Sequence, residues 1–239
     1  MAIEPFLAMT GAEIAGKPEF PKRTAWMACH FSPYGLGLSN LPKSLPDGSV
    51  LMVNDVTPPH GHDPVYVGKQ LIGCVEKWKC SGVLLDFQRV GCEETMAIAE
   101  SLVKALPCPT VVSEIYARNL DCPVFLPPVP PSVPMGEHLA PWKDREIWLE
   151  LGLDGEILSL TEAGCEVTPL LHPDLDAQGF VEEKLCCHYQ IATNEKSARF
   201  TLWRTIDDID FLWNKAKSHG IMHCVGLYQE IATSLRSSQ

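Results

Sequence analysis

Apolar residues along this chain gather into short runs, and each run ends in a group of polar side chains. The clearest run spans residues 81–89 (SGVLLDFQR), in which a glycine and three aliphatic residues precede Asp86, Gln88 and Arg89. An uninterrupted aliphatic run of this kind is typical of a strand that is buried on both faces, as in a parallel sheet. Residues 92–106 follow with apolar positions at helical spacing. The pattern therefore predicts a strand, a polar tip and a helix.

The first half of the chain repeats this arrangement, with the run at 81–89 as the third strand. The other expected strands cover residues 24–31, 49–56, 109–116 and 124–126. A helix is predicted over residues 65–78, where Val67, Leu71 and Val75 recur at helical spacing. Residues 127–134 are rich in proline, which excludes a helix and favours a surface crossover.

The hydrophobic pattern of the second half of the chain has a different period. Asp154-Gly155 is a hairpin signal, and we expect it to join strands over residues 146–153 and 156–160. A second hairpin is expected to join residues 184–191 to residues 198–203. A helix over residues 207–219 and a last strand over residues 221–228 complete the chain.

Alternating strands and helices predict a parallel sheet with right-handed crossovers. About eight strands fit one (β/α)8 TIM-like barrel, with a degenerate second half and β-hairpin insertions. We expect a single barrel domain over residues 1–239. A doubly wound sheet with an antiparallel appendage is the alternative.

Composition narrows the classes of partner. The formal net charge of −11 argues against a nucleic-acid ligand, which requires concentrated Lys and Arg. None of the ten cysteines forms a C-x-x-C pair, so zinc knuckles and thioredoxin-type motifs are excluded, and reduced thiols are expected. The first 22 residues lack a signal-peptide pattern, and no apolar run is long enough to cross a bilayer. The sequence predicts a cytoplasmic protein with no membrane partner.

In a barrel, the polar residues that follow each strand converge on one pocket at the carboxyl face. These candidate site residues are His30, Asn54, Asp55, Asp86, Gln88, Arg89, Glu114, Tyr116, Tyr228 and Glu230. Alternatively, individual members cap the helices that follow them, as Asp and Asn often do.

Two other chemistries receive less support. His60, His62 and Asp63 could ligate a metal, but they lie in a proline-bounded loop where a turn and a helix start account for them. Cys29 beside His30 is the one candidate thiol nucleophile, and its apolar surroundings indicate a core residue. No metal or other cofactor is predicted.

Residues 81–88 (SGVLLDFQ) resemble the signature strand of glycoside hydrolase family 18, the chitinase-like barrels, which reads D-G-x-D-x-D-x-E. Gly82 matches the glycine, Asp86 the last aspartate and Phe87 the usual aromatic residue. Ser81 and Leu84 replace the first two aspartates, and Gln88 stands at the position of the catalytic glutamate. Residues 201–230 are also similar to the family's ending, in which an Asp-Asp pair opens a helix before the last strand.

The resemblance implies a mechanism in which a carboxylic acid protonates the glycosidic oxygen while an aspartate orients the substrate's acetamido group. A glutamine amide cannot donate that proton, although it can hydrogen-bond a sugar. We therefore expect a family-18-like barrel that binds a glycan or small polar ligand without ordinary chitinase activity, with Asp86 and Gln88 at its centre. Tyr116 and Tyr228 are the aromatic residues expected to stack on a sugar.

Two alternatives remain open. The first is an active glycosidase or other hydrolase in which Glu114 acts with Asp86 or Asp55. The second is a structural or interaction protein without a small-molecule site. The sequence assigns no oligomeric state.

Overall fold

The structure is a computed structural model that describes residues 4–15, 21, 23–170 and 179–237. The chain divides into two compact units. Unit 1 comprises residues 1–126 and 144–148, and unit 2 comprises residues 127–143 and 149–239.

The larger sheet has nine strands in the order β1-β14-β8-β7-β6-β5-β4-β2-β3, and β1 also pairs with β2. This order closes eight of the strands into a parallel barrel, which confirms the predicted TIM-like fold. The barrel strands are β1 (Phe6–Met9), β2 (Thr24–Phe31), β4 (Val50–Asn54), β5 (Gly82–Asp86), β6 (Thr110–Ser113), β7 (Val124–Leu126), β8 (Ile147–Leu151) and β14 (His223–Leu227), and β3 (Leu38–Ser39) is antiparallel to β2.

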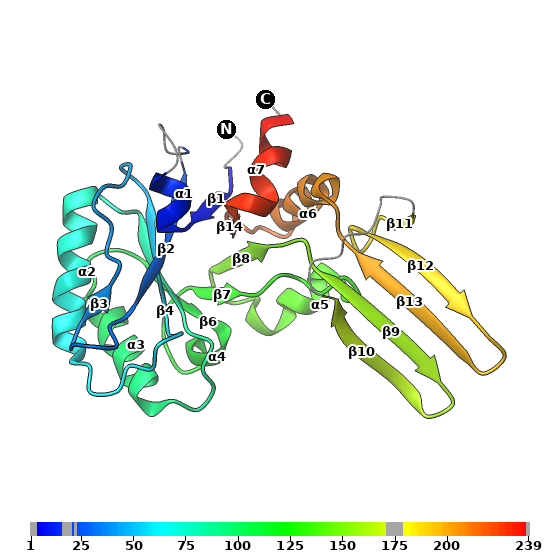
Figure 1. The fold of residues 1–239 in the computed structure, drawn as a ribbon, viewed down its shortest axis with the longest axis horizontal. Coiled ribbons are helices and arrows are strands. Elements are labelled where there is room, and N and C mark those ends of the chain that lie inside the picture. The colour runs from blue at the N-terminus through cyan, green and yellow to red at the C-terminus, as the bar shows by residue number, and fades with distance from the viewer. Residues whose placement is uncertain (1–3, 16–20, 22, 171–178, 238–239) are drawn as a thin grey trace. The chain divides into compact units, whose positions relative to one another are not determined.

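Helices of very different length connect these strands. They are α1 (Gly11–Ala15), α2 (Pro64–Trp78), α3 (Glu93–Ala105), α4 (Glu114–Ala117), α5 (Met135–Leu139), the 3-10 helix η1 (Ala140–Trp142), α6 (Ile206–Ser218) and α7 (Tyr228–Ser237). Figure 1 shows α2 and α3 side by side along one flank of the strands of unit 1. No described helix is long and apolar enough to cross a membrane.

Strand β5 is buried on both faces, as its aliphatic run predicts. Val83, Leu84 and Leu85 have no exposed surface. At Gly82 an added Cβ would lie 3.2 Å from the Pro109 carbonyl oxygen, closer than most side chains tolerate. The glycine at the start of the run therefore permits the close approach of the neighbouring backbone.

Unit 2 contains a separate antiparallel sheet in the order β10-β9-β13-β12-β11 (Figure 1). Its strands are β9 (Gly155–Thr161), β10 (Gly164–Leu170), β11 (Phe180–Glu182), β12 (Cys187–Thr193) and β13 (Ser197–Trp203). The hairpin predicted for residues 184–203 is present as β12 and β13.

The hairpin predicted at Asp154-Gly155 is wrong. Strand β8 belongs to the barrel sheet, whereas β9 pairs with β10 and β13. The Asp154 carbonyl accepts a hydrogen bond from the Arg204 backbone N–H at 3.1 Å, so the pairing with β13 extends to this position. The dipeptide therefore marks the change from one sheet to the other, and the actual hairpin turn, between β9 and β10, was not predicted.

One strand and two strand ends also differ from the predictions. Strand β1 was missed, which makes β5 the fourth barrel strand in chain order and not the third. Strand β6 ends at Ser113, whose hydroxyl donates to the Phe87 carbonyl at 2.6 Å, and residues 114–117 turn into α4. Strand β14 ends at Leu227, so Tyr228 opens α7.

Candidate functional site

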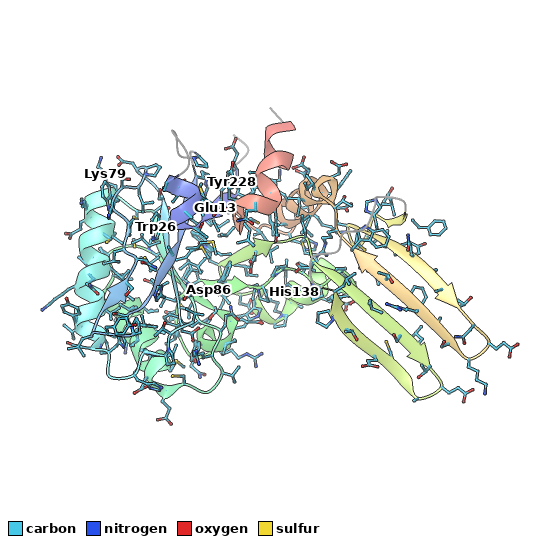
Figure 2. All side chains as sticks on the ribbon, viewed as in Figure 1. Glu13, Trp26, Lys79, Asp86, His138 and Tyr228 are labelled. Carbon is cyan, nitrogen blue, oxygen red and sulfur yellow. The ribbon has the colours of Figure 1, made fainter. Side chains whose placement is uncertain are left out.

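Three of the predicted site residues form a row at the carboxyl ends of three neighbouring strands of unit 1. His30 of β2 is in register with Asn54 of β4, and Asn54 is in register with Asp86 of β5. Residues in register on neighbouring parallel strands direct their side chains to the same face of the sheet. All three are partly exposed, and Figure 2 labels Asp86 at its strand end. The structure thus brings His30, Asn54 and Asp86 together.

Gln88 adds an amide to this row. Its Nε2 donates a hydrogen bond to Asp86 Oδ1 at 2.6 Å. Burial raises the pKa of Asp86, the hydrogen bond from Gln88 opposes that rise, and the nearby Asp55 adds to it. The result is a carboxyl group that holds its proton more readily than an exposed aspartate, beside an amide with an accessible carbonyl oxygen.

Asp55 lies next to the row but has a different role. It is buried, its Oδ1 accepts the Gln88 backbone N–H at 2.8 Å, and its Oδ2 accepts the Arg89 backbone N–H at 3.0 Å. Both carboxylate oxygens are therefore engaged in holding the loop that follows β5.

Arg89 and Tyr116 hold the same loop from other directions. The Arg89 guanidinium donates from Nε to the Asp55 carbonyl and from Nη2 to the Val56 carbonyl, each at 2.7 Å. The buried Tyr116 donates its hydroxyl to the Arg89 carbonyl, and its ring packs edge-on against Phe87. These contacts give Asp55, Arg89 and Tyr116 a supporting position behind the Asp86–Gln88 pair.

Glu114 opens α4 and is partly exposed. In the part of the chain that the structure describes, no hydrogen bond or ion pair joins Glu114 to Asp86 or Gln88. The sequence placed Glu114 at a strand end, and the structure places it on the helix that follows.

Tyr228 and Glu230 belong to unit 2, in the first turn of α7. Glu230 Oε2 accepts the Leu153 backbone N–H at 3.1 Å. Glu230 therefore fixes the chain that follows β8, and Figure 2 labels Tyr228 at the start of α7.

Sequence reasoning missed two charged residues of unit 2. Arg204 is buried and donates to the backbone carbonyls of Val129, Leu185 and Cys186. Burial raises the pKa of Asp154, and the positive charge of Arg204 opposes the rise. The Asp154-Gly155 turn signal indicated backbone geometry alone and gave no sign of the buried Arg204.

The residues considered for a metal site and for a thiol nucleophile have other local roles. His60 Nδ1 lies 2.5 Å from Glu94, and Asp63 caps α2 by accepting the Val65 N–H at 3.0 Å. Among the described residues, no three His, Cys, Asp or Glu side chains are grouped so that they could hold a metal ion. Burial raises the pKa of Cys29 to about 12, which leaves its thiol protonated near neutral pH.

A cavity of about 770 Å³ lies within unit 1 and adjoins the row of strand-end residues. Its described lining comes from Thr10, α1, β2, residues 40, 41, 43 and 44, and Asn54. Asn54 belongs both to the lining and to the row, so the cavity borders the row at this residue. The sequence pattern gave no indication of the cavity, because a loop and a short helix form most of its wall.

No protein-family model matches the chain, and no curated protein is similar enough in sequence to count as a relative. Solved structures do match. The spore cortex-lytic enzyme SleL of Bacillus cereus superimposes with a TM-score of 0.58 at 12% identity, over 94% of this chain and 70% of that one. A chitinase-like agglutinin from Robinia pseudoacacia gives 0.58 at 13% identity, over 92% of this chain and 93% of that one.

A doubly substituted variant of a GH18 chitinase from Cycas revoluta gives a TM-score of 0.57 at 12% identity, over 93% of this chain and 94% of that one. At these identities the likeness establishes the fold. The chain therefore has the barrel fold of the glycoside hydrolase family 18 chitinases, as the resemblance of residues 81–88 predicted.

Proposed function

We propose that this barrel binds a glycan at the row formed by His30, Asn54 and Asp86, and that it lacks ordinary chitinase activity. The observation that carries the proposal is the 2.6 Å hydrogen bond from Gln88 Nε2 to Asp86 Oδ1. It puts an amide, and not an acid, where the family 18 motif has its proton donor.

The chemistry of the pair suits binding. A glutamine amide keeps a carbonyl acceptor and a second N–H donor, and the Asp86 carboxyl group offers further oxygen acceptors. Sugar hydroxyl and acetamido groups need such mixed partners. The Gln88 amide cannot protonate the glycosidic oxygen, which is the step that the general acid of this family performs.

Structural neighbours support a glycan as the ligand class. The Cycas chitinase variant, which carries a glutamate-to-glutamine substitution, is in complex with (GlcNAc)4, and another structure of a Cycas family 18 chitinase is in complex with allosamidin. A barrel of this fold thus accommodates a chito-oligosaccharide when a glutamate has been replaced by glutamine.

The buried position of Asp55 weighs against an active site built on Glu114 and Asp55. Both oxygens of Asp55 already accept backbone N–H groups, so this carboxylate cannot act on a substrate without releasing the loop after β5. A hydrolase that pairs Glu114 with Asp86 is the remaining catalytic alternative.

Calorimetric titration with (GlcNAc)4 tests the proposal. Wild-type protein should bind without releasing shorter sugars, and Asp86→Ala and Gln88→Ala should each weaken binding at least about tenfold through lost hydrogen bonds. Glu93→Ala, an exposed change on α3, is the matched control and should leave binding unchanged.

Two results would contradict the proposal in different ways. Hydrolysis that disappears in Glu114→Gln would identify an active glycosidase. Absence of binding to (GlcNAc)4 and to a panel of simple sugars would favour a structural or interaction role.

A Gln88→Glu variant tests whether the amide is what prevents catalysis. The new carboxyl would lie beside Asp86, and two carboxyls at hydrogen-bond distance share one proton, which raises the pKa of the pair. We expect slow release of shorter sugars from (GlcNAc)4 by this variant and none by wild type. An inactive variant that still binds would show that the amide at position 88 is not the one cause of the missing catalysis.

A further inference from the structure

The cavity beside α1 has the size of a small-molecule site. Its volume of about 770 Å³ lies within the range of about 300–1,000 Å³ that is usual for ligand pockets. Every described residue that lines it belongs to unit 1.

The walls of the cavity are built to remain open. The register between β2 and β4 shifts between Trp26 and Cys29, so β2 carries an extra residue there, and Met27 and Ala28 line the cavity. Helix α1 has only five residues and buries none of them. A short helix that presents Gly11, Ala12, Ile14 and Ala15 to the cavity therefore lies over a bulged strand, with space between them.

Hydrogen bonds fix the two walls. The Trp26 indole N–H donates to the Asn40 carbonyl at 2.8 Å, which ties the segment at residues 40–44 to β2. Thr10 donates its backbone N–H and its hydroxyl to Glu13 at 2.7 and 2.8 Å, which fixes the start of α1. Figure 2 labels Trp26 and Glu13 on these two elements, which contact each other. The cavity is thus a formed feature of unit 1.

The charge of the lining is one-sided. Lys43 is the one charged side chain among the described residues that line the cavity, and no salt bridge in the described part of the chain involves it. Of the nearby carboxylates in the sequence, Glu13 of α1 accepts from Thr10, and Asp47 pairs with Lys79 at 2.7 Å. In a chain with a net charge of −11, the exposed Lys43 ammonium, which has no ion pair among the described residues, favours an anionic ligand group at this cavity wall.

We propose that this cavity receives an anionic substituent, a carboxylate or a phosphate, on the saccharide that binds at Asp86 and Gln88. Lys43 recognises the charge, Trp26 and Met27 supply an apolar wall, and Asn54 joins the cavity to the row of strand-end residues. The inference rests on the proposed glycan binding and narrows the ligand to acidic sugars.

Matched ligands test the inference. Affinities would be measured by titration calorimetry for a neutral N-acetylglucosamine disaccharide, for its counterpart with one N-acetylmuramic acid unit, and for N-acetylglucosamine 6-phosphate. The carboxylate and phosphate ligands distinguish the two sources of charge. The variants are Lys43→Gln, the charge-retaining Lys43→Arg, and the control Lys69→Gln, an exposed lysine on α2 outside the cavity.

We expect wild type to bind one acidic ligand about tenfold more tightly than the neutral one, as one charge-assisted contact allows. Lys43→Gln should abolish that preference, whereas Lys43→Arg and Lys69→Gln should keep it. The preference should also shrink as salt rises, because the contact is electrostatic.

The outcomes separate this inference from the proposed function. If the neutral ligand binds as tightly as the acidic ligands, or if the preference for an acidic ligand survives Lys43→Gln, the inference alone is overturned. Binding of an acidic ligand that depends on Lys43 but not on Asp86 sustains the cavity and overturns the proposed glycan site. Failure of every ligand to bind overturns both.

Discussion

Two aspartates at neighbouring strand ends of unit 1 have different environments and different tasks. Asp55 is buried with both oxygens bound by the backbone N–H groups of Gln88 and Arg89, whereas Asp86 is partly exposed and receives one bond from an amide side chain. The first position suits support of a loop, and the second suits contact with a ligand. The same residue type at the end of the same kind of strand therefore has two different roles. Its burial and its hydrogen-bond partners decide which role it has.

Asp55→Ala should destabilise the protein, because it removes two charge-assisted hydrogen bonds from a buried site. We expect a loss of about 2–3 kcal/mol in the free energy of unfolding, measured with urea. Asp55→Asn keeps one carbonyl oxygen as acceptor and should lose less. Equal stability of Asp55→Ala and wild type would show that the loop after β5 holds its conformation without this residue.

Asp86 should give stability an unusual dependence on pH. Burial raises the pKa of this carboxyl, so the folded protein binds the proton more tightly than the unfolded chain does. Its stabilising contribution is therefore complete below the ordinary value of 3.8 and is lost as pH rises through the folded pKa.

Asp86→Asn removes this titration while keeping an acceptor for Gln88. The variant should be more stable than wild type at about pH 7, and the difference should vanish at about pH 3. Urea midpoints across that range measure the effect, with the exposed Asp47→Asn as control. A difference that does not change with pH would mean that the carboxyl is not desolvated.

At the scale of elements, the sequence predicted best where one periodic run forms one element. Strand β2 has the predicted bounds, and α2 begins one residue early because Asp63 caps it and Pro64 occupies its first turn. Strand β1 was not predicted, because four buried residues are too few to show a hydrophobic period. Strand β8 was assigned to the wrong partner because a turn dipeptide indicates local geometry and not which sheet a strand joins.

The candidate site was predictable in part for the same reason. Strand ends are visible in the sequence, so His30, Asn54 and Asp86 could be expected to lie together before their register was known. The supporting roles of Asp55 and Tyr116 depend on the path of the loop after β5, which no periodic pattern encodes.

The start of α6 is an element boundary that depends on one buried carboxylate. Asp208 Oδ2 accepts from the Thr205 backbone N–H at 2.7 Å and from the Thr205 hydroxyl at 2.9 Å, and it lies 2.9 Å from His188 Nδ1 on β12. Asp208→Ala should cost about 3 kcal/mol, because it removes the Asp208 side chain from the capping box and leaves the buried His188 imidazole without this carboxylate. Thr205→Ala removes only the cap and should cost about 1 kcal/mol. Equal losses in urea unfolding would exclude a contribution from the His188 contact.

At the scale of the whole molecule, compact units and barrel strands do not coincide. Strand β8 contributes its first two residues to unit 1 and the rest to unit 2, and the closed strand order takes members from both units. A closed barrel leaves no free edge when it is complete. A single domain over residues 1–239, as expected from the sequence, therefore predicts that the two units unfold together.

We expect calorimetry to show one unfolding transition with equal calorimetric and van't Hoff enthalpies. Leu84→Ala in unit 1 and Leu212→Ala in unit 2 remove fully buried side chains, and each should cost about 3 kcal/mol. At about 2–4 °C per kcal/mol, each variant should lower the midpoint of the one transition by about 6–12 °C. Two transitions, of which each variant moves only one, would mean that the units unfold independently. In that case the barrel would be closed by two domains, and ligand binding in unit 1 would raise the midpoint of one transition alone.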